Sequence, residues 1–159
     1  MKLQFLSKRD SRELSRLIME RLGFEFTPEK KLEVDEKTSV LIGDGFFVLQ
    51  EDLVFPFILD RRTAQLPEVE VDAGAVPHVL NGASIMRPGI VKVEEGVKRG
   101  SVVRVTNGGR ILCVGLSMYD REELLSASKG VVVKNLHRRN DRIWKAVSEY
   151  VSTARRQSP

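Results

Sequence analysis

The second half of the chain consists of short apolar segments separated every few residues by glycine, proline or asparagine. The segments are Ser84–Met86, Ile90–Val93, Ser101–Val105, Ile111–Leu116 and Gly130–Leu136. Each is too short for a stable helix, and most are rich in the β-branched residues that favour strands. Asn107-Gly108-Gly109, between two of them, predicts a tight hairpin turn. Many short strands with little helix predict a small β-barrel.

The first sixty residues predict a different arrangement, in which one helix covers a small antiparallel sheet. Residues 12–22 carry leucine and isoleucine at helical spacing, and Gly23 suits a left-handed helix end. Asp10 and Glu13 have the spacing of a capping box. Extended segments follow at 32–34, 40–42, 46–49 and 53–59, and Pro56 places the last of them at a sheet edge. The chain as a whole is therefore predicted to be an α+β protein.

The polar stretch from Asp60 to Glu68 has the composition of a loop, and we place a domain boundary there. The expected organisation is an N-terminal domain at residues 1–68, a barrel domain at 69–147 and a basic tail at 148–159. The formal net charge is +4, and residues 129–159 hold eight Lys/Arg against two Asp/Glu. A basic end of this kind is typical of polyanion binders, although a basic tail can also serve solubility alone.

No arrangement of residues predicts catalysis. Zinc needs three or four suitable ligands, and Cys113, His78 and His137 show no ligand spacing. Cys113 lies in an apolar strand and is expected in the core. His137, next to Arg138 and Arg139, is expected to be a surface or partly packed residue that is able to contact a phosphate. Since no dinucleotide-binding or phosphate-loop glycine pattern is present either, we predict no enzyme activity, no metal and no cofactor.

The sequence gives no sign of a membrane or secretory protein. No apolar run approaches the ~20 residues that a membrane-spanning helix needs. Residues 1–10 lack the apolar core of a signal peptide, and the single cysteine excludes an intrachain disulfide. We therefore expect a cytoplasmic protein.

The segment from Asp72 to Gly89 is the most informative one for function. Asp72 is expected to cap a short helix that ends at Gly82, and Pro88-Gly89 is expected to bend the strand that follows. The glycines leave backbone with little side-chain bulk, which suits close approach of a sugar–phosphate chain or a flat base. The competing interpretation is that these glycines only form corners of the barrel.

Two separate motifs resemble one known family. Val71–Ala75, Gly82-Ala83 and Met86–Ile90 come first, and Lys129–His137 and Asn140–Trp144 follow much later in the chain. In this order they resemble the PUA domain, named for pseudouridine synthases and archaeosine transglycosylases. The closing part is most similar to the MCT-type proteins (multiple copies in T-cell lymphoma) and to the N-terminal part of the initiation factor ligatin, in which a helix-plus-sheet domain precedes the PUA domain.

The resemblance implies a β pseudobarrel that binds structured RNA, often the acceptor end of tRNA or a ribosomal RNA helix. For the MCT group it also implies a role in translation on the small ribosomal subunit, with the N-terminal domain binding a partner translation factor. RNA contacts are implied along the glycine-rich segment and the last strand, and the basic residues after that strand are added to them. The expected RNA-binding residues are Gly74, Gly82, Ala83, Met86, Arg87, Pro88, Gly89, Lys129, Lys134, Arg138 and Arg139.

One alternative is a tRNA- or rRNA-modifying enzyme, or an RNA-recognition or adaptor subunit that serves one, because PUA domains are often fused to such enzymes. A catalytic role would need an active site within residues 1–68. That region offers only isolated aspartates outside any catalytic motif: Asp35, Asp44, Asp52 and Asp60.

A further alternative is a protein-interaction adaptor that binds its partner through the N-terminal sheet. Exposed aromatic side chains at Phe5, Phe24 or Phe26 would favour this function. All three are expected in the core, because large aromatic side chains are mostly buried.

Overall fold

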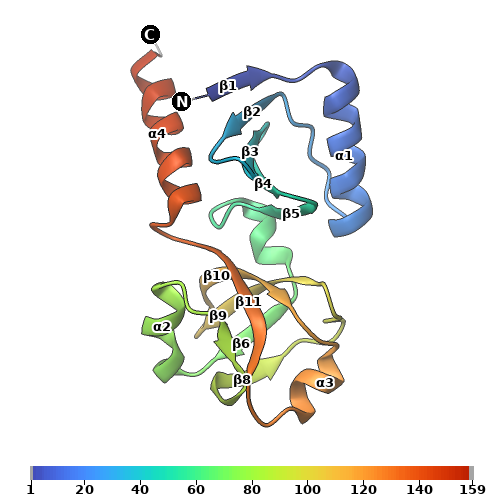
Figure 1. Cartoon of the computed structure of the whole chain (residues 1–159), viewed down its shortest axis with the longest axis vertical. Coiled ribbons are helices and arrows are strands. Elements are labelled where there is room, and N and C mark those ends of the chain that lie inside the picture. Colours follow the sequence, from blue (N-terminus) through green and yellow to red (C-terminus); the bar gives the residue numbers. More distant parts are fainter. Residues whose placement is uncertain (1, 158–159) are drawn as a thin grey trace. The chain divides into compact units, whose positions relative to one another are not determined.

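A computed structural model of the chain describes residues 2–157 and divides into two compact units (Figure 1). Unit 1 contains the residues up to Asp60 together with those from Asn140 onward, and unit 2 contains Arg61–Arg139. Both units combine strands with helices, so the predicted α+β class is confirmed. No helix in the described part of the chain is long and apolar enough to cross a membrane.

Unit 1 is built on a five-stranded antiparallel sheet in which each strand pairs with the next one along the chain. Its strands are β1 (Lys2–Phe5), β2 (Lys30–Glu33), β3 (Thr38–Ile42), β4 (Phe46–Gln50) and β5 (Leu53–Pro56). β5 is an edge strand, as Pro56 predicted. β1 forms the other edge, and its four residues are all exposed.

One face of this sheet is covered by α1 (Lys8–Leu22). The helix begins four residues before the predicted start, because the hydroxyl of Ser7 caps it by accepting the N–H of Asp10 at 3.1 Å. The predicted capping box at Asp10 was therefore wrong, whereas the predicted exit at Gly23, with φ 74°, is confirmed. Ile18 of α1 is fully buried in a cluster with Phe26, Leu41, Phe47 and Val54.

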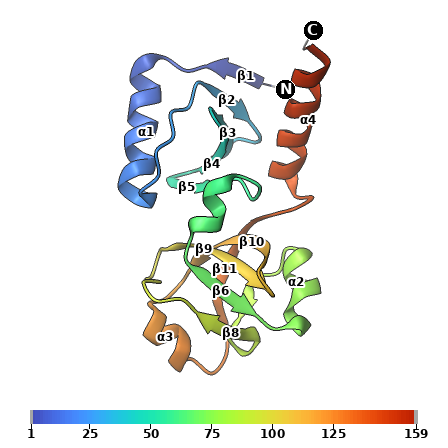
Figure 2. The ribbon, with the colours of Figure 1, turned by 180° about the vertical axis from the view of Figure 1, so that it is seen from behind.

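The opposite face of the sheet carries α4 (Arg142–Gln157), as Figures 1 and 2 show from two sides. The ring of Trp144 stacks on Phe57 with centroids 5.7 Å apart, and Tyr150 meets the edge of Phe46 at 6.1 Å. The Nζ of Lys30 donates a hydrogen bond to the Tyr150 hydroxyl at 3.1 Å. These contacts join α4 to β2, β4 and the segment after β5.

The observed division therefore differs from the expected one at two places. The expected barrel domain ran to residue 147, with a tail from 148, but the whole of α4 groups with unit 1. The expected loop after Asp60 contains a short 3-10 helix at Arg61–Gln65 and belongs to unit 2. Thr63 and Leu66 are buried, which a free linker would not allow.

Unit 2 is built on a mixed six-stranded sheet with the order β7-β11-β10-β9-β6-β8. Its strands are β6 (Glu68–Val71), β7 (Ile85–Met86), β8 (Ile90–Val93), β9 (Val102–Asn107), β10 (Arg110–Ser117) and β11 (Val131–Arg138). β6 and β9 are parallel, and the other pairs are antiparallel. The strands enclose a core of mainly valine, isoleucine and leucine, so the predicted succession of short strands around one core is confirmed.

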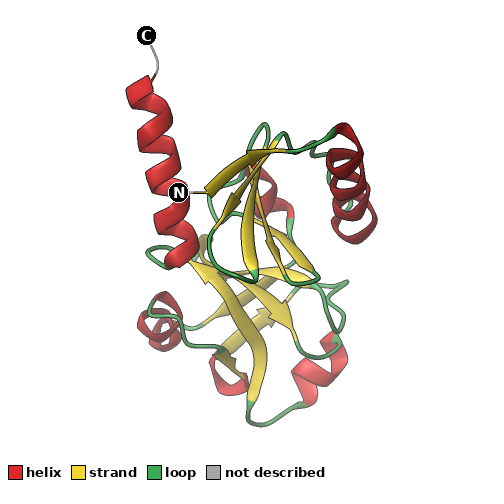
Figure 3. Ribbon diagram, turned by 45° about the horizontal axis from the view of Figure 1, so that its top comes forward, coloured by secondary structure: helices red, strands yellow, loops and turns green. Residues whose placement is uncertain are grey.

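Short helical turns connect these strands, and α2 (Val76–Leu80) and α3 (Arg121–Ser126) flank unit 2 on opposite sides (Figures 1 and 3). The expected helix from Asp72 to Gly82 is split into a 3-10 turn, Ala73–Ala75, and α2. Asp72 caps the first turn as predicted, since its carboxylate accepts the N–H of Ala75 at 2.9 Å.

Candidate nucleic-acid interface

The glycine-rich segment, residues 82–89, lies beside β11 in unit 2. Met86 is paired with Val131 across the sheet, and Ile85 with Val133. The backbone N–H of Arg87 donates to the carbonyl of Gly130 at 2.9 Å. The two motifs, which lie about forty residues apart in the sequence, thus form one continuous surface.

The entrance to this segment is fixed by the side chain of Asn135. Its Nδ2 donates to the carbonyls of Val79, at 3.1 Å, and Ala83, at 3.0 Å. Its backbone N–H donates to the hydroxyl of Ser84 at 3.2 Å. β11 therefore positions the end of α2 as well as β7.

Gly82 is required by its conformation, and it also lies close to a side chain of β11. Its φ of 99° is a conformation that other residues rarely adopt. A Cβ atom at this position would lie 2.9 Å from the Nε of Arg138 on β11. Gly89 is also close to its neighbours, since its carbonyl accepts the N–H of Asp72 at 2.9 Å and a Cβ would lie 3.3 Å from that of Ala75. The backbone is bare here because the chain packs closely.

The predicted RNA-binding residues lie in unit 2 and differ in exposure. Most of them are exposed to solvent: Gly74, Gly82, Ala83, Met86, Pro88, Lys129, Lys134 and Arg139. The others are half-buried: Arg87, Gly89 and Arg138. Within the part of the chain that the structure describes, Lys129 and Lys134 form no ion pair, so their charges face solvent uncompensated.

Arg87 is directed into the fold instead of outward. Its guanidinium donates to the carbonyl of Leu125 at 3.1 Å and to that of Ile90 at 3.4 Å. Leu125 lies in the last turn of α3, where carbonyl groups lack partners within the helix. The Nε of Arg87 is buried and has no hydrogen-bond partner among the described residues. Arg87 therefore fixes the α3 end beside the glycine-rich segment.

His137 was predicted to be a surface or partly packed residue able to reach a phosphate, and this was wrong. Its side chain is 1% exposed and lies on β11 opposite Val114. His78 is exposed on α2. Cys113 is buried in β10 as predicted, and burial raises the pKa of its thiol.

Sequence reasoning missed one component of the surface, Val131, which forms an apolar pair with the predicted residue Met86. Their side chains are 49% and 46% exposed although the residues are direct neighbours across β7 and β11. Val131 begins the apolar run Val131–Val133 of the predicted last strand, and this pattern does not mark it as exposed. A register shift between Val131 and Val133 breaks the strand alternation and leaves Val131 outside. The pair forms an apolar platform next to Lys129.

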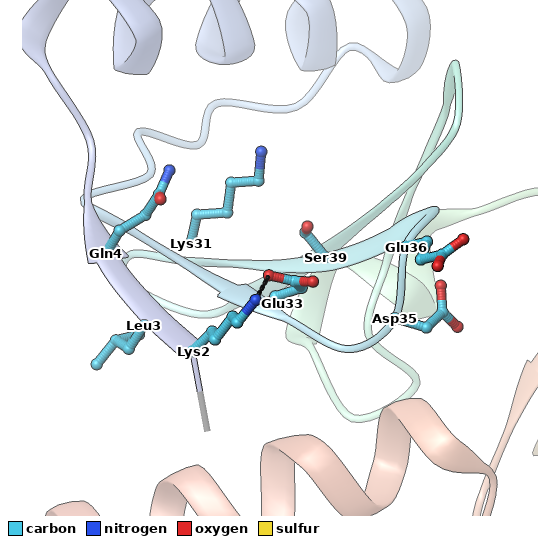
Figure 4. A pocket seen from close by; sticks show the side chains of 8 residues that line it. All are labelled: Lys2, Leu3, Gln4, Lys31, Glu33, Asp35, Glu36 and Ser39. Atoms are coloured by element: carbon cyan, nitrogen blue, oxygen red, sulfur yellow. Dashed lines mark ion pairs between the residues drawn. The ribbon is translucent and has the colours of Figure 1, made fainter.

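A hollow lies in unit 1, at the β1–β2–β3 end of its sheet, with a volume of about 600 Å³ (Figure 4). Five charged residues line it: Lys2, Lys31, Glu33, Asp35 and Glu36. Lys2 and Glu33 form an ion pair at 3.7 Å. No group of three or more potential metal ligands occurs among residues 2–157.

Asp35, which lines this hollow, has its ionised form stabilised by two hydrogen bonds. Its Oδ1 accepts the N–H of Lys37 at 2.9 Å, and its Oδ2 accepts the Nε of Arg142 at 2.7 Å. The hydrogen bond from Lys37 and then that from Arg142 lower the pKa of Asp35. Asp60, another of the isolated aspartates, is buried and accepts the N–H of Phe46 at 3.0 Å. Both carboxylates have structural hydrogen bonds, which favours a role in folding over one in acid–base chemistry.

Comparison with known proteins assigns unit 2 to a class. A family model described as the PUA domain matches residues 67–138, which begin just before β6 and end with β11. The fold and its glycine-rich segment are thus those of a PUA domain.

Relatives match most of the chain, beyond the PUA domain alone. It is 32% identical to human malignant T-cell-amplified sequence 2, over 74% of this chain and 70% of that protein. It is also 32% identical to translation machinery-associated protein 20 of Schizosaccharomyces pombe, over 79% of this chain and 77% of that protein. The crystal structure of a hypothetical protein from Pyrococcus horikoshii matches with a TM-score of 0.75 and 32% identity, covering 91% of this chain and 98% of that one. The chain belongs to the malignant T-cell-amplified sequence family of PUA-domain proteins.

Proposed function

We propose that the chain is a cytoplasmic RNA-binding protein of the translation machinery, without a catalytic centre of its own. The surface formed by the glycine-rich segment and β11 contacts the RNA, which is the acceptor end of a tRNA or a ribosomal RNA helix. Membership of a family that includes translation machinery-associated protein 20 supports the role in translation.

The observation that carries this proposal is the joining of the two motifs into one surface with three complementary parts. Bare backbone at Gly82-Ala83 admits a sugar–phosphate chain closely. The apolar pair Met86 and Val131 offers a platform for a base or a sugar. Lys129 and Lys134 supply positive charge that no described carboxylate neutralises, and charge of this kind gains most from phosphates because counterions are released.

The test is fluorescence anisotropy with labelled tRNA over a salt series, using Lys129→Gln/Lys134→Gln. If both lysines contact phosphates, the slope of log K against log salt becomes shallower by about 1.4 to 1.8. A matched control is Lys92→Gln/Lys98→Gln, which removes two exposed charges from the β8 side of unit 2. Absence of binding at low salt, or equal slopes for the variant and the wild type, would count against the proposal.

The identity of the RNA is tested with tRNA that has or lacks its single-stranded 3′ end. Preference for the intact end indicates recognition of the acceptor end. Equal binding to both, together with co-sedimentation with small ribosomal subunits, indicates ribosomal RNA instead. Arg87 is unsuitable for these tests, because its guanidinium is bound to carbonyls of the fold.

Phe5 favours a second function, that of an adaptor for a partner translation factor. Against expectation, its side chain is 79% exposed on the edge strand β1, whereas Phe24 and Phe26 pack into the unit 1 core as expected. An exposed edge strand with an aromatic side chain can accept an added strand from a partner. If it does, Phe5→Lys will weaken co-sedimentation with small subunits only when the partner factor is present.

A further inference from the structure

The outer face of α1 carries a line of positive charge. Lys8, Arg12 and Arg16 are spaced four residues apart, and all three are exposed. Each step of four residues advances about 6 Å along the helix axis and keeps the side chains on one face. We call these three residues the basic stripe. The face of α1 toward the sheet is formed by other residues, notably Leu14 and the fully buried Ile18.

The stripe works against the stability of its own helix. Like charges four residues apart repel one another, and a lysine in the first turn opposes the helix dipole. Among residues 2–157 none of the three cations has an ion-pair partner, although Arg9 on the same helix pairs with Glu13 at 3.4 Å. The Nε of Arg12 donates only to the carbonyl of Lys8, at 3.3 Å. Unfavourable local interactions of this kind concentrate at functional sites, and the basic stripe is therefore a candidate binding site.

The charges and the composition of the exposed face of α1 indicate which kind of ligand it can bind. A row of cations at regular spacing on a rigid helix complements a row of phosphates. The sequence of α1 contains no aromatic residue on which an unpaired base could stack, as sites for single strands normally do. Paired RNA keeps its bases inside and presents its phosphates in a fixed ridge. The face therefore suits a duplex better than a single strand.

We propose that α1 is a second RNA-contacting surface, in which Lys8, Arg12 and Arg16 bind the phosphate backbone of double-helical RNA. This proposal rests on the proposed function and deepens it. Unit 2 recognises its RNA by close approach of bare backbone, and the basic stripe adds a contact that is independent of sequence.

The test uses the full chain with Lys8→Gln/Arg12→Gln/Arg16→Gln and two labelled probes, a blunt RNA duplex and tRNA. Glutamine is a good helix former, so α1 is retained, and circular dichroism with thermal melting verifies this. For the duplex we expect the slope of log K against log salt to become shallower by about 2 to 3, with at least a tenfold loss of affinity at low salt. The charge-matched control is Lys92→Gln/Lys98→Gln/Arg99→Gln in unit 2, which is expected to change the slope little.

The outcomes separate this proposal from the proposed function. Unchanged duplex binding in the stripe variant overturns the proposal, and the proposed function survives if Lys129→Gln/Lys134→Gln still weakens tRNA binding. An equal loss of duplex affinity in the control variant also overturns the proposal, because the loss then reflects net charge alone. Unchanged RNA binding with weakened binding of polyglutamate would assign the stripe to an acidic protein and also overturn it. If the wild type binds neither RNA at low salt, both proposals fail.

Discussion

The proposed RNA surface of unit 2 consists mostly of backbone, whereas the one proposed in unit 1 consists of the charged side chains of a single helix. The unit 2 surface exists only because the glycine-rich segment pairs with β11, where a Cβ at Gly82 would lie 2.9 Å from Arg138. The three residues of the basic stripe all lie within the single helix α1, so the stripe forms whenever this helix forms. One surface therefore depends on tertiary packing and the other on local sequence.

This difference teaches how substitutions will act. In unit 2 a change of shape at a glycine disturbs both the fold and the binding surface, so the two effects appear together. In unit 1 a change of charge on α1 leaves the buried face untouched, so binding can be lost without a loss of stability. Measuring stability and RNA affinity on the same variants distinguishes the two cases.

The largest expected effect concerns what holds unit 1 together. Phe57 is buried between Phe46, at 5.9 Å, and Trp144 of α4, at 5.7 Å between ring centroids. Phe57→Ala is expected to lower the free energy of unfolding by about 3 to 5 kcal/mol, since it leaves a cavity under α4. Chemical denaturation followed by tryptophan fluorescence measures this. The exposed neighbour Leu59 provides the control, and Leu59→Ala is expected to cost less than about 0.5 kcal/mol. Similar costs for both would mean that α4 is not packed on Phe57.

The next effect tests the dependence of unit 2 on bare backbone. Gly82 and Gly96 have nearly equal φ angles, 99° and 90°, but only at Gly82 would an added Cβ have a neighbour within 4 Å. Gly82→Ala is expected to cost about 1 to 3 kcal/mol and to weaken tRNA binding, because backbone strain is joined by a clash with Arg138. Gly96→Ala is expected to show the strain alone and unchanged tRNA binding.

Denaturation and fluorescence anisotropy on the two glycine variants measure these quantities. The double variant Gly82→Ala/Arg138→Ala is expected to recover part of the lost stability, since the clashing side chain is gone. Equal losses of stability for Gly82→Ala and Gly96→Ala would show that the clash with Arg138 contributes nothing and that backbone conformation alone explains the loss.

Much of the fold could be predicted because its signals are local. Gly23 and Gly82 have the positive φ angles that their positions at helix ends suggested, and Asp72 caps the turn as expected. β1 was missed, although Lys2–Phe5 alternates between polar and apolar residues, because an alternation of only four residues is a short signal. By its place in the sequence, α4 was divided between the barrel domain, up to residue 147, and the basic tail from residue 148. Its real position depends on contacts such as that of Trp144 with Phe57, which are remote in the chain.

The candidate site was predictable as a segment but not as an arrangement of side chains. The resemblance implied that both motifs contact RNA, and in the structure β7 and β11 pair and bring the two motifs together. Strand alternation could not place Val131 or His137, because register shifts interrupt β11 on both sides, against β7 and against β10. Nor could it show that Arg87 turns inward, since this depends on the carbonyl of Leu125 at the end of α3.

The smallest expected effect concerns the ion pair that joins the start of α4 to the β2–β3 turn. Asp35 and Arg142 lie 2.7 Å apart, but their side chains are 40% and 54% exposed, so water screens the attraction. Asp35→Asn is expected to lower the free energy of unfolding at neutral pH by at most about 1 kcal/mol. The folded state lowers the pKa of Asp35 below its ordinary value of 3.8. The stabilisation is therefore present above that value and is lost as the pH falls through the lower pKa of the folded state.

Denaturation of the wild type and Asp35→Asn between pH 7 and strongly acidic pH tests this last prediction. The difference between the two proteins is expected to be largest above the ordinary pKa and to shrink toward zero as the carboxylate takes up its proton. Glu36→Gln is the control, since Glu36 is the exposed neighbour and has no ion pair in the described part of the chain. A difference that stays constant with pH would show that the charge of Asp35 adds no stability, either through the hydrogen bond from Lys37 or through the ion pair with Arg142.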